Sequence, residues 1–186
     1  MKHLLVIGFA CVFIVACGGS DSEPEASAPP PPPPATDIWK ASAEGMVSVV
    51  QQHIDAGTDV NGTFSIEGVP GTGGTPLHIA LLAHQNDVAK LLIANGADVN
   101  RKAILPDPFG GTPLHWAVGF ENAAGVNALL DAGANPNSTD NYGSKPLDVA
   151  ILDLTTFQPM EYTNLSPSKK GIYDTLYGKG ARHRQP

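Results

Sequence analysis

Short apolar stripes with helical spacing, separated by glycine and proline, recur along most of the chain. In the first of them, Val47, Val50 and Ile54 fall on one side of a helix. Comparable stripes run over residues 88–93 and 126–130. Each stripe is followed by a glycine at the point where a left-handed residue commonly ends a helix, namely Gly57, Gly96 and Gly133. The pattern indicates a series of similar helical units.

Two motifs mark the beginning and the end of these units. Residues 75–78 and 112–115 both read Thr-Pro-Leu-His, and residues 96–100 and 133–137 both read Gly-Ala-x-x-Asn. Proline in the second position of the first motif is compatible with the first turn of a helix. A motif pair that returns in this order predicts a repeat protein, and such proteins usually bind other molecules instead of catalysing reactions.

These motifs resemble those of ankyrin repeats, and the resemblance extends over residues 36–183. It implies an all-α ankyrin-repeat solenoid of about four helix-turn-helix repeats, with β-hairpin fingers of which two are extended. The repeats would cover residues 36–61, 75–100, 112–137 and 145–181. The first lacks the proline motif and has the polar outer residues of an N-terminal cap. The fourth carries an insertion, about residues 153–167, before a second helix that begins near Lys169.

The resemblance gives the Thr-Pro-Leu-His residues a structural role. In this family the motif imidazole bonds neighbouring backbone and threonine, which implies that role for Thr75, His78, Thr112 and His115. In the fourth repeat, residues 145–148 read Lys-Pro-Leu-Asp, so this network is expected to be absent or altered there. Trp116 follows a motif histidine, at a position that we expect to be in the core.

The fingers, which connect each closing asparagine to the next motif, are the predicted binding elements. The separation is fourteen residues after Asn61 and twelve after Asn100, against about eight in the family. Long loops on one side of a repeat array are common binding elements. The candidate partner-binding residues are Phe64, Ile66, Phe109, Phe120, Asn141 and Tyr142. Alternatively, the extended fingers fold back and bury these groups against one another.

The first seventeen residues have the pattern of a bacterial lipoprotein signal. An apolar core runs from Leu4 to Ala16, which is too short to span a bilayer but suits a secretory signal. Residues 14–17 resemble a lipobox, in which the cysteine is lipidated and becomes the new N-terminus. We therefore expect a signal peptide at 1–16 and membrane attachment through lipidated Cys17. An ordinary signal peptide with a chance cysteine is the alternative, and a spanning anchor is less favoured.

A proline-rich tether is expected over residues 17–35, between the lipid and the repeats. It holds six consecutive prolines, Pro29 to Pro34, and after the glycines it has no hydrophobic residue larger than alanine and proline. Such a segment cannot bury a core and favours an extended, disordered chain. A spacer is the preferred interpretation, and a ligand for aromatic-grooved domains is the alternative. Residue 18 is glycine and not aspartate, which indicates the outer membrane, facing the periplasm, if the host is Gram-negative.

Composition and the remaining motifs argue against several kinds of chemistry. The net charge of −7 argues against nucleic acid, which needs a basic face. Both cysteines precede the repeats, which therefore hold no thiolate metal site, and no metal or cofactor is expected. Ser166–Lys169 matches the Ser-x-x-Lys motif of penicillin-recognising enzymes, but the companion motifs are absent. His53 and His84 are expected on helix surfaces, and Asp131, Asp140 and Asp153 on a solvated face or an acidic rim.

The sequence therefore predicts a non-enzymatic protein–protein interaction module of the bacterial cell envelope. It would bind a protein partner of unknown identity through its concave face and long fingers, in a scaffold, protective or toxin-immunity type of role. The alternative is a binder of a small molecule or cell-wall ligand, held in a pocket between the fingers and the fourth-repeat insertion. Residues 184–186 are expected to be a short tail.

Overall fold

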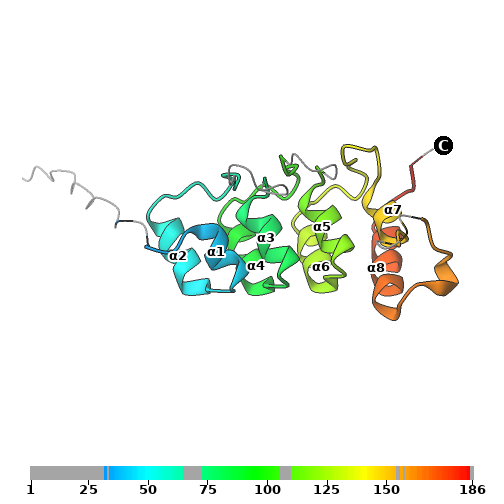
Figure 1. The fold of residues 1–186 in the computed structure, drawn as a ribbon, viewed down its shortest axis with the longest axis horizontal. Coiled ribbons are helices and arrows are strands. Elements are labelled where there is room, and N and C mark those ends of the chain that lie inside the picture. Colours follow the sequence, from blue (N-terminus) through cyan, green and yellow to red (C-terminus); the bar gives the residue numbers. More distant parts are fainter. Residues whose placement is uncertain are drawn as a thin grey trace, which may run out of the picture.

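The computed structural model describes residues 32, 34–64, 73–104, 110–153, 156 and 158–184. Within these ranges the chain forms an all-α solenoid of four helix pairs stacked side by side (Figure 1). The first helices of the pairs are α1 (Ile38–Ala43), α3 (Pro76–Leu82), α5 (Pro113–Gly119) and α7 (Pro146–Ala150). The second helices are α2 (Val47–Asp55), α4 (Asn86–Ala94), α6 (Ala123–Asp131) and α8 (Pro167–Gly178). A short 3₁₀ helix, η1 (Tyr162–Asn164), precedes α8.

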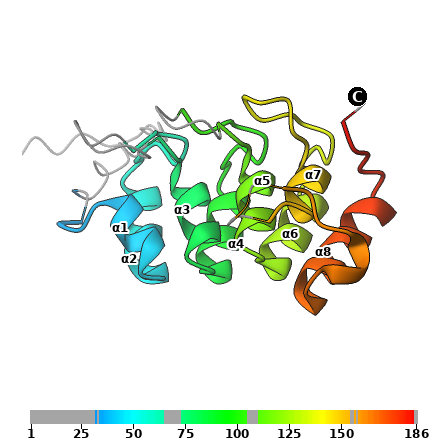
Figure 2. The ribbon, with the colours of Figure 1, turned by 45° about the vertical axis from the view of Figure 1, so that its right-hand side comes forward.

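The helices form two layers, and the fingers project together from one side of them (Figures 1 and 2). Each first helix packs on the next first helix, and each second helix packs on the next second helix. The motif leucines Leu77, Leu114 and Leu147 are completely buried, and so are leucines of the second helices at positions 92, 129 and 176. The apolar stripes therefore build one core that continues from pair to pair.

Glycines end the second helices as the sequence predicted. Gly57, Gly96 and Gly133 adopt φ values of 77°, 87° and 87°, a left-handed conformation that a side chain would disfavour. The turn between the two helices of a pair is also left-handed, and there two non-glycine residues, His84 (φ 58°) and Glu121 (φ 55°), adopt it. The exposed His84 ring reaches the next repeat, where its Nε2 lies 2.9 Å from the carbonyl oxygen of Phe120.

The fingers are hairpins without β-ladders in the part of the chain that the structure describes. Among these residues a backbone hydrogen bond joins the two arms of each finger, from Phe64 N–H to Gly74 (3.0 Å), Ala103 to Gly111 (3.0 Å) and Asp140 to Ser144 (2.9 Å). Neighbouring fingers are connected as well, because Ile104 N–H donates to the Gly73 carbonyl over 2.9 Å. A β-ladder needs consecutive bonds between the two arms of a hairpin, and a single bond does not provide them.

A buried histidine of the N-terminal pair contacts the segment that leads into α1. His53 is 5% exposed, so the prediction that it lies on a helix surface was wrong. Its Nε2 lies 2.6 Å from the carbonyl oxygen of Thr36, and its Nδ1 lies 3.2 Å from the Thr58 hydroxyl. Asp37 caps the start of α1, because its carboxylate accepts from the Lys40 N–H over 2.8 Å. The contacts of this pair therefore reach back to Thr36.

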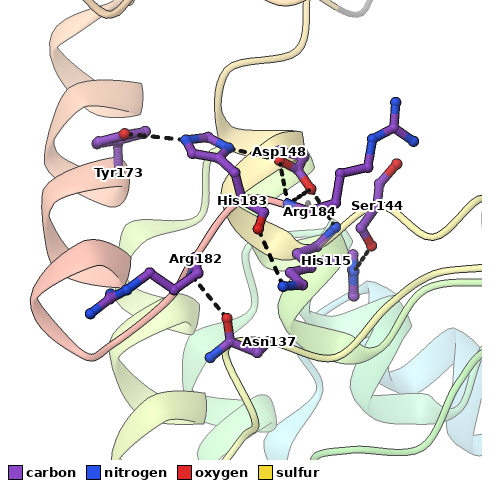
Figure 3. A network of polar contacts seen from close by, with 9 residues as sticks. His115, Asn137, Ser144, Asp148, Tyr173, Arg182, His183 and Arg184 are labelled. Atoms are coloured by element: carbon purple, nitrogen blue, oxygen red, sulfur yellow. Dashed lines mark hydrogen bonds and ion pairs between the residues drawn. The ribbon is translucent and has the colours of Figure 1, made fainter. Parts of the chain in front are cut away.

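The fourth pair replaces the threonine–histidine network with a carboxylate network (Figure 3). Asp148 accepts from the Lys145 N–H over 2.9 Å, and its other oxygen lies 2.7 Å from Nδ1 of His183. The opposite ring nitrogen of His183 lies 3.3 Å from the Tyr173 hydroxyl. Asp148 also accepts from the Arg184 N–H, so the ordered chain continues one residue beyond the predicted tail boundary.

The second helix of this pair begins at Pro167, two residues before its predicted start. Ser166 explains the difference, because its side chain accepts from the Lys169 N–H over 3.1 Å and caps the helix. The same hydroxyl donates to Glu121 over 3.1 Å, which ties the insertion to the third repeat. An isolated antiparallel β-bridge also joins Leu152, just before the insertion, to Pro159 within it.

Candidate protein-binding surface

The Thr-Pro-Leu-His motifs join each first helix to the finger that follows it. The Thr75 N–H donates to Nδ1 of His78 over 3.2 Å, and the Thr75 hydroxyl lies 2.9 Å from the same nitrogen. Because Nδ1 accepts, the ring proton is on Nε2, which donates to the Gly111 carbonyl over 3.3 Å. Thr112 and His115 repeat this arrangement, with Nε2 3.0 Å from the Ser144 carbonyl. All four residues therefore take part in hydrogen bonds that join a first helix to the finger that follows it.

Burial keeps both motif histidines neutral. His78 is completely buried, and desolvation lowers its pKa from 6.5 to about 4, against an opposing effect of the Gly111 carbonyl. Desolvation also lowers the pKa of His115. Neutral imidazoles that hold two fixed hydrogen bonds suit a scaffold, and they leave no free nitrogen for acid–base chemistry.

The closing asparagines form a second connection between repeats, which the sequence interpretation missed. The Asn61 side chain accepts from Asp98 N–H (2.7 Å) and donates to the Gly96 carbonyl (3.0 Å). Asn100 makes the same pair of bonds to the third repeat, and Asn137 makes it to the fourth. The recurrence of asparagine at one position of the closing motif was the available signal, since its amide can donate and accept at once.

The candidate partner-binding residues fall into groups with different surroundings. Phe64 is half-buried and packs against Trp39 with 5.7 Å between ring centroids, which favours the alternative of a finger folded back on the domain. Ile66 and Phe109 lie outside the described residues. Asn141 and Tyr142 are exposed on the third finger, and Tyr142 exposes 57% of its surface. A Cβ on Gly110 would overlap the Asn141 side chain, so the second and third fingers touch at this point.

An aromatic series runs along the first helices. Phe120 follows the last turn of α5 and is 46% exposed, and its ring lies 6.2 Å from that of Trp116. Trp116 in turn meets the ring of His78 edge-on at 5.3 Å. Trp116 is half-buried, so its prediction as a core residue was wrong. The equivalent residue of α3, Ile79, is half-buried too, so this position of the first helices lies at the edge of the core.

The predicted acidic rim does not form as a set. Asp140 is 7% exposed, and its carboxylate accepts from the N–H groups of Tyr142 and Ser144, each over 2.8 Å. It therefore shapes the turn of the third finger. Asp131 forms an ion pair with Lys179 on the second-helix side, at 3.2 Å. Asp153 lies in the fourth-repeat insertion, where its N–H donates to the Gln158 carbonyl over 3.0 Å.

The structure assigns the Ser-x-x-Lys residues to helix capping. The Ser166 hydroxyl caps α8, as described above. The Lys169 ammonium donates to the Leu152 carbonyl over 2.7 Å, and among the described residues it makes no contact with the serine hydroxyl. Within the same ranges, no group of three or more His, Cys, Asp or Glu side chains could hold a metal ion. None of the described helices combines the length and apolarity needed to cross a membrane.

The stacked helix pairs form a repeat solenoid, with projecting fingers and with hydrogen bonds of asparagine and histidine between repeats. Solenoids of this class usually serve as protein–protein interaction modules. A family model described as ankyrin repeats, in three copies, matches residues 38–140. The chain therefore belongs to the ankyrin repeat family. This membership confirms the resemblance on which the fold was predicted.

Similar curated proteins share the repeats but differ in the rest of their length. The fowlpox virus (strain NVSL) ankyrin repeat protein FPV031 is 34% identical over 112 residues, which is 60% of this chain and 31% of the viral protein. The palmitoyltransferase Hip14 of Drosophila melanogaster is 34% identical over 111 residues, 58% of this chain and 15% of that protein. Human ankyrin repeat and SOCS box protein 6 is 39% identical over 79 residues, 42% and 18% respectively. The chain spans less than a third of the length of each.

Proposed function

We propose that this protein is a membrane-anchored binding module, which holds a protein partner between its fingers and its first helices and carries out no chemistry. The observation that carries the proposal is the aromatic series on this side, in which Phe120 is exposed beside half-buried Trp116. Exposed aromatic groups on a rigid frame are typical anchors of protein interfaces. Tyr142, on the third finger, adds a second exposed ring.

Recognition would depend on shape and charge. The net charge of −7 favours a partner with a basic or mixed surface, because complementary charge increases the rate and specificity of association. The hydrogen bonds between His78, His115 and the bases of the following fingers fix the finger positions before binding, and a preorganised surface loses less entropy. A scaffold, a protective partner of a secreted enzyme and a toxin-immunity protein all use binding of this kind, and the choice among them rests on analogy.

The proposed location is the bacterial cell envelope, with lipid on Cys17 and the domain facing the periplasm from the outer membrane of a Gram-negative host. The apolar core of residues 4–16 and the lipobox-like sequence before Cys17 support this. The proline-rich tether, residues 17–35, would keep the binding surface away from the lipid. Cys17 lies outside the described residues, so the sequence alone supports the anchoring.

The binding proposal is tested by affinity capture from the envelope of the source organism. The baits are residues 36–186 with the native sequence, the double variant Phe120→Ala/Tyr142→Ala, and the control Tyr177→Ala. Tyr177 is 58% exposed on α8, which matches Tyr142 in exposure but lies on the second-helix layer. We expect a protein that the native and control baits retain and the double variant loses, with all three baits equally folded by circular dichroism.

Equal retention on all three baits would contradict the assignment of the binding surface. Loss on the control bait alone would move the site to the C-terminal pair. Anchoring is tested separately, by metabolic labelling with a fatty acid and fractionation of the membranes. Cys17→Ser should abolish the label and release the protein from the outer-membrane fraction, and a label that persists in this variant would refute lipidation at Cys17.

A further inference from the structure

The C-terminal helix pair presents aromatic side chains where the interior pairs pack on their neighbours. The helix-ending glycines, Gly57, Gly96, Gly133 and Gly180, give the register of the four second helices. In this register Tyr173 corresponds to three buried residues, namely Val50, Ala89 and Val126. Tyr177 corresponds to residues partly buried against the core, namely Ile54, Ile93 and Leu130. Tyr177 is 58% exposed, so its position lacks the cover that its counterparts receive.

These tyrosines belong to a connected surface. The rings of Tyr173 and Tyr177 are stacked 6.3 Å apart, and Tyr162 meets Tyr173 edge-on at 5.2 Å. The Lys170 ammonium lies 5.9 Å from the Tyr162 ring, and the Arg182 guanidinium lies 5.3 Å from the Tyr177 ring. We call these five residues the tail surface. Terminal repeats usually have a polar outer face, whereas tyrosine and arginine are the residues enriched in interface hot spots.

The charge of α8 and the residues that follow it is opposite to that of the rest of the chain. Residues 167–184 contain five of the 11 lysines and arginines but only one, Asp174, of the 18 acidic residues. The remaining sequence therefore holds six cations and seventeen acids. The Asp174 carboxylate accepts from the Tyr162 hydroxyl at 3.0 Å. An acidic partner with some apolar surface would complement the tail surface, and the other end of this same chain has that character.

At the N-terminal end, two apolar side chains are exposed near the turn between α1 and α2. In later repeats, residues of this turn contact the preceding helix pair. Met46 is 37% exposed and Val47 is 42% exposed. In the register of the glycines, Met46 corresponds to Gln85 and Asn122. The side chains of these two residues donate to carbonyls of the preceding pair, at Ala43 (3.4 Å) and Leu81 (3.0 Å).

The N-terminal helix pair is acidic. Residues 37–59, which contain α1 and α2, hold one cation, Lys40, against four acids, namely Asp37, Glu44, Asp55 and Asp59. We call Met46, Val47 and these acids the head surface. Its two apolar side chains and its negative charge complement the aromatic and positive tail surface.

We propose that the tail surface of one copy binds the head surface of a second copy, so that the helix pairs continue from one molecule into the next. Such a head-to-tail contact is heterologous, and it leaves one tail and one head free for further copies. Opposite charges near the interface make the association weaker in salt. The inference goes beyond the proposed function, because it uses the two ends of the solenoid and leaves the fingers accessible.

Site-directed cross-linking in the full chain tests this contact. Cys11→Ser and Cys17→Ser remove both native thiols, and the protein is kept in detergent micelles. A copy with Met46→Cys is mixed with a copy with Tyr177→Cys and treated with a bifunctional maleimide. The matched control replaces the second copy by one with Tyr142→Cys, because Tyr142 and Tyr177 are 57% and 58% exposed. Circular dichroism checks that every variant is folded.

We expect several-fold more cross-linked dimer from the Met46/Tyr177 pair than from the Met46/Tyr142 pair. One chain with both Met46→Cys and Tyr177→Cys should give a ladder of longer products. In 1 M salt, where the screening length falls to about 3 Å, the yield should fall towards the control. Equal yields from the two pairs would overturn the proposal.

Charge reversal provides an independent variant. Lys170→Glu together with Arg182→Glu should lower the Met46/Tyr177 yield to that of the control pair, because the tail surface then repels the acidic head surface. Lys90→Glu, which changes an exposed lysine on α4, should leave the yield unchanged. A yield that persists in the folded double variant would also overturn the proposal.

Discussion

Acid should weaken the fold through His78. Burial lowers the pKa of this imidazole to about 4, while in the unfolded chain it returns to about 6.5. Between these two values the unfolded chain binds a proton that the folded chain does not, so the free energy of unfolding falls as the pH falls. The stability is complete above pH 6.5, and the loss ends near pH 4. The difference between the two pKa values corresponds to about 3 kcal/mol.

Carboxylates also change protonation in this range, so the effect of His78 is measured as a difference. His78→Gln removes the titrating ring and retains a side-chain amide that can donate towards Gly111. Urea unfolding, followed by far-ultraviolet circular dichroism, gives the free energy of unfolding of both proteins from pH 7.5 to pH 4. We expect the native protein to be more stable at pH 7.5, and the stability gap to shrink by about 3 kcal/mol at pH 4.

Two comparisons make this result decisive. His84→Gln removes a histidine whose side chain is exposed, and it controls for the loss of an imidazole as such. His115, whose pKa is also lowered by burial, is present in all three proteins and cancels in the difference. If the free energies of unfolding of the native protein and of His78→Gln change in parallel from pH 7.5 to pH 4, burial does not lower the pKa of His78.

Two further predictions concern stability at neutral pH. Asn100→Ala removes the bonds to the third repeat (2.8 and 3.4 Å) and should cost about 1–2 kcal/mol in urea unfolding, whereas exposed Asn127→Ala should stay within about 0.5 kcal/mol. An equal effect of the two would contradict the inter-repeat ladder. Ser166→Ala should cost about 1 kcal/mol through loss of the α8 cap, and Ser166→Thr should restore most of it. Full stability of Ser166→Ala would contradict the capping role.

The sequence predicted the parts of the fold that local rules determine. The proline at the start of a first helix, the glycine after a second helix and the apolar stripe between them each act within one turn of the chain. Their positions in the structure agree with the prediction, including the left-handed conformations of Gly57, Gly96 and Gly133. The fourth repeat was harder, because its insertion separates the two helices and the capping Ser166 belongs to an enzyme-like motif.

Contacts between distant residues explain the errors. His53 is polar, but it is 5% exposed, and its ring contacts the carbonyl of Thr36, seventeen residues earlier. Trp116 follows a buried position in sequence, yet it is half-buried, as is Ile79 at the equivalent position of α3. For the candidate binding residues, sequence indicated their exposure correctly at Phe120 and Tyr142, whereas the packing of Phe64 on Trp39 depends on the finger conformation.

At the ends of the solenoid, the contacts that stabilise the stack can be distinguished from the surfaces that we propose bind another molecule. Inside the array, the closing asparagine of each repeat both donates and accepts a hydrogen bond to the next repeat. The last of them is Asn137, which donates to the Gly180 carbonyl and accepts from the Arg182 N–H. The next position of that register holds Arg184, an exposed cation without the asparagine amide, so the ladder stops there although the tyrosines beside it remain partly uncovered. Among the described residues the asparagine ladder therefore does not cover the aromatic tail surface, which is the surface that we propose a second copy covers.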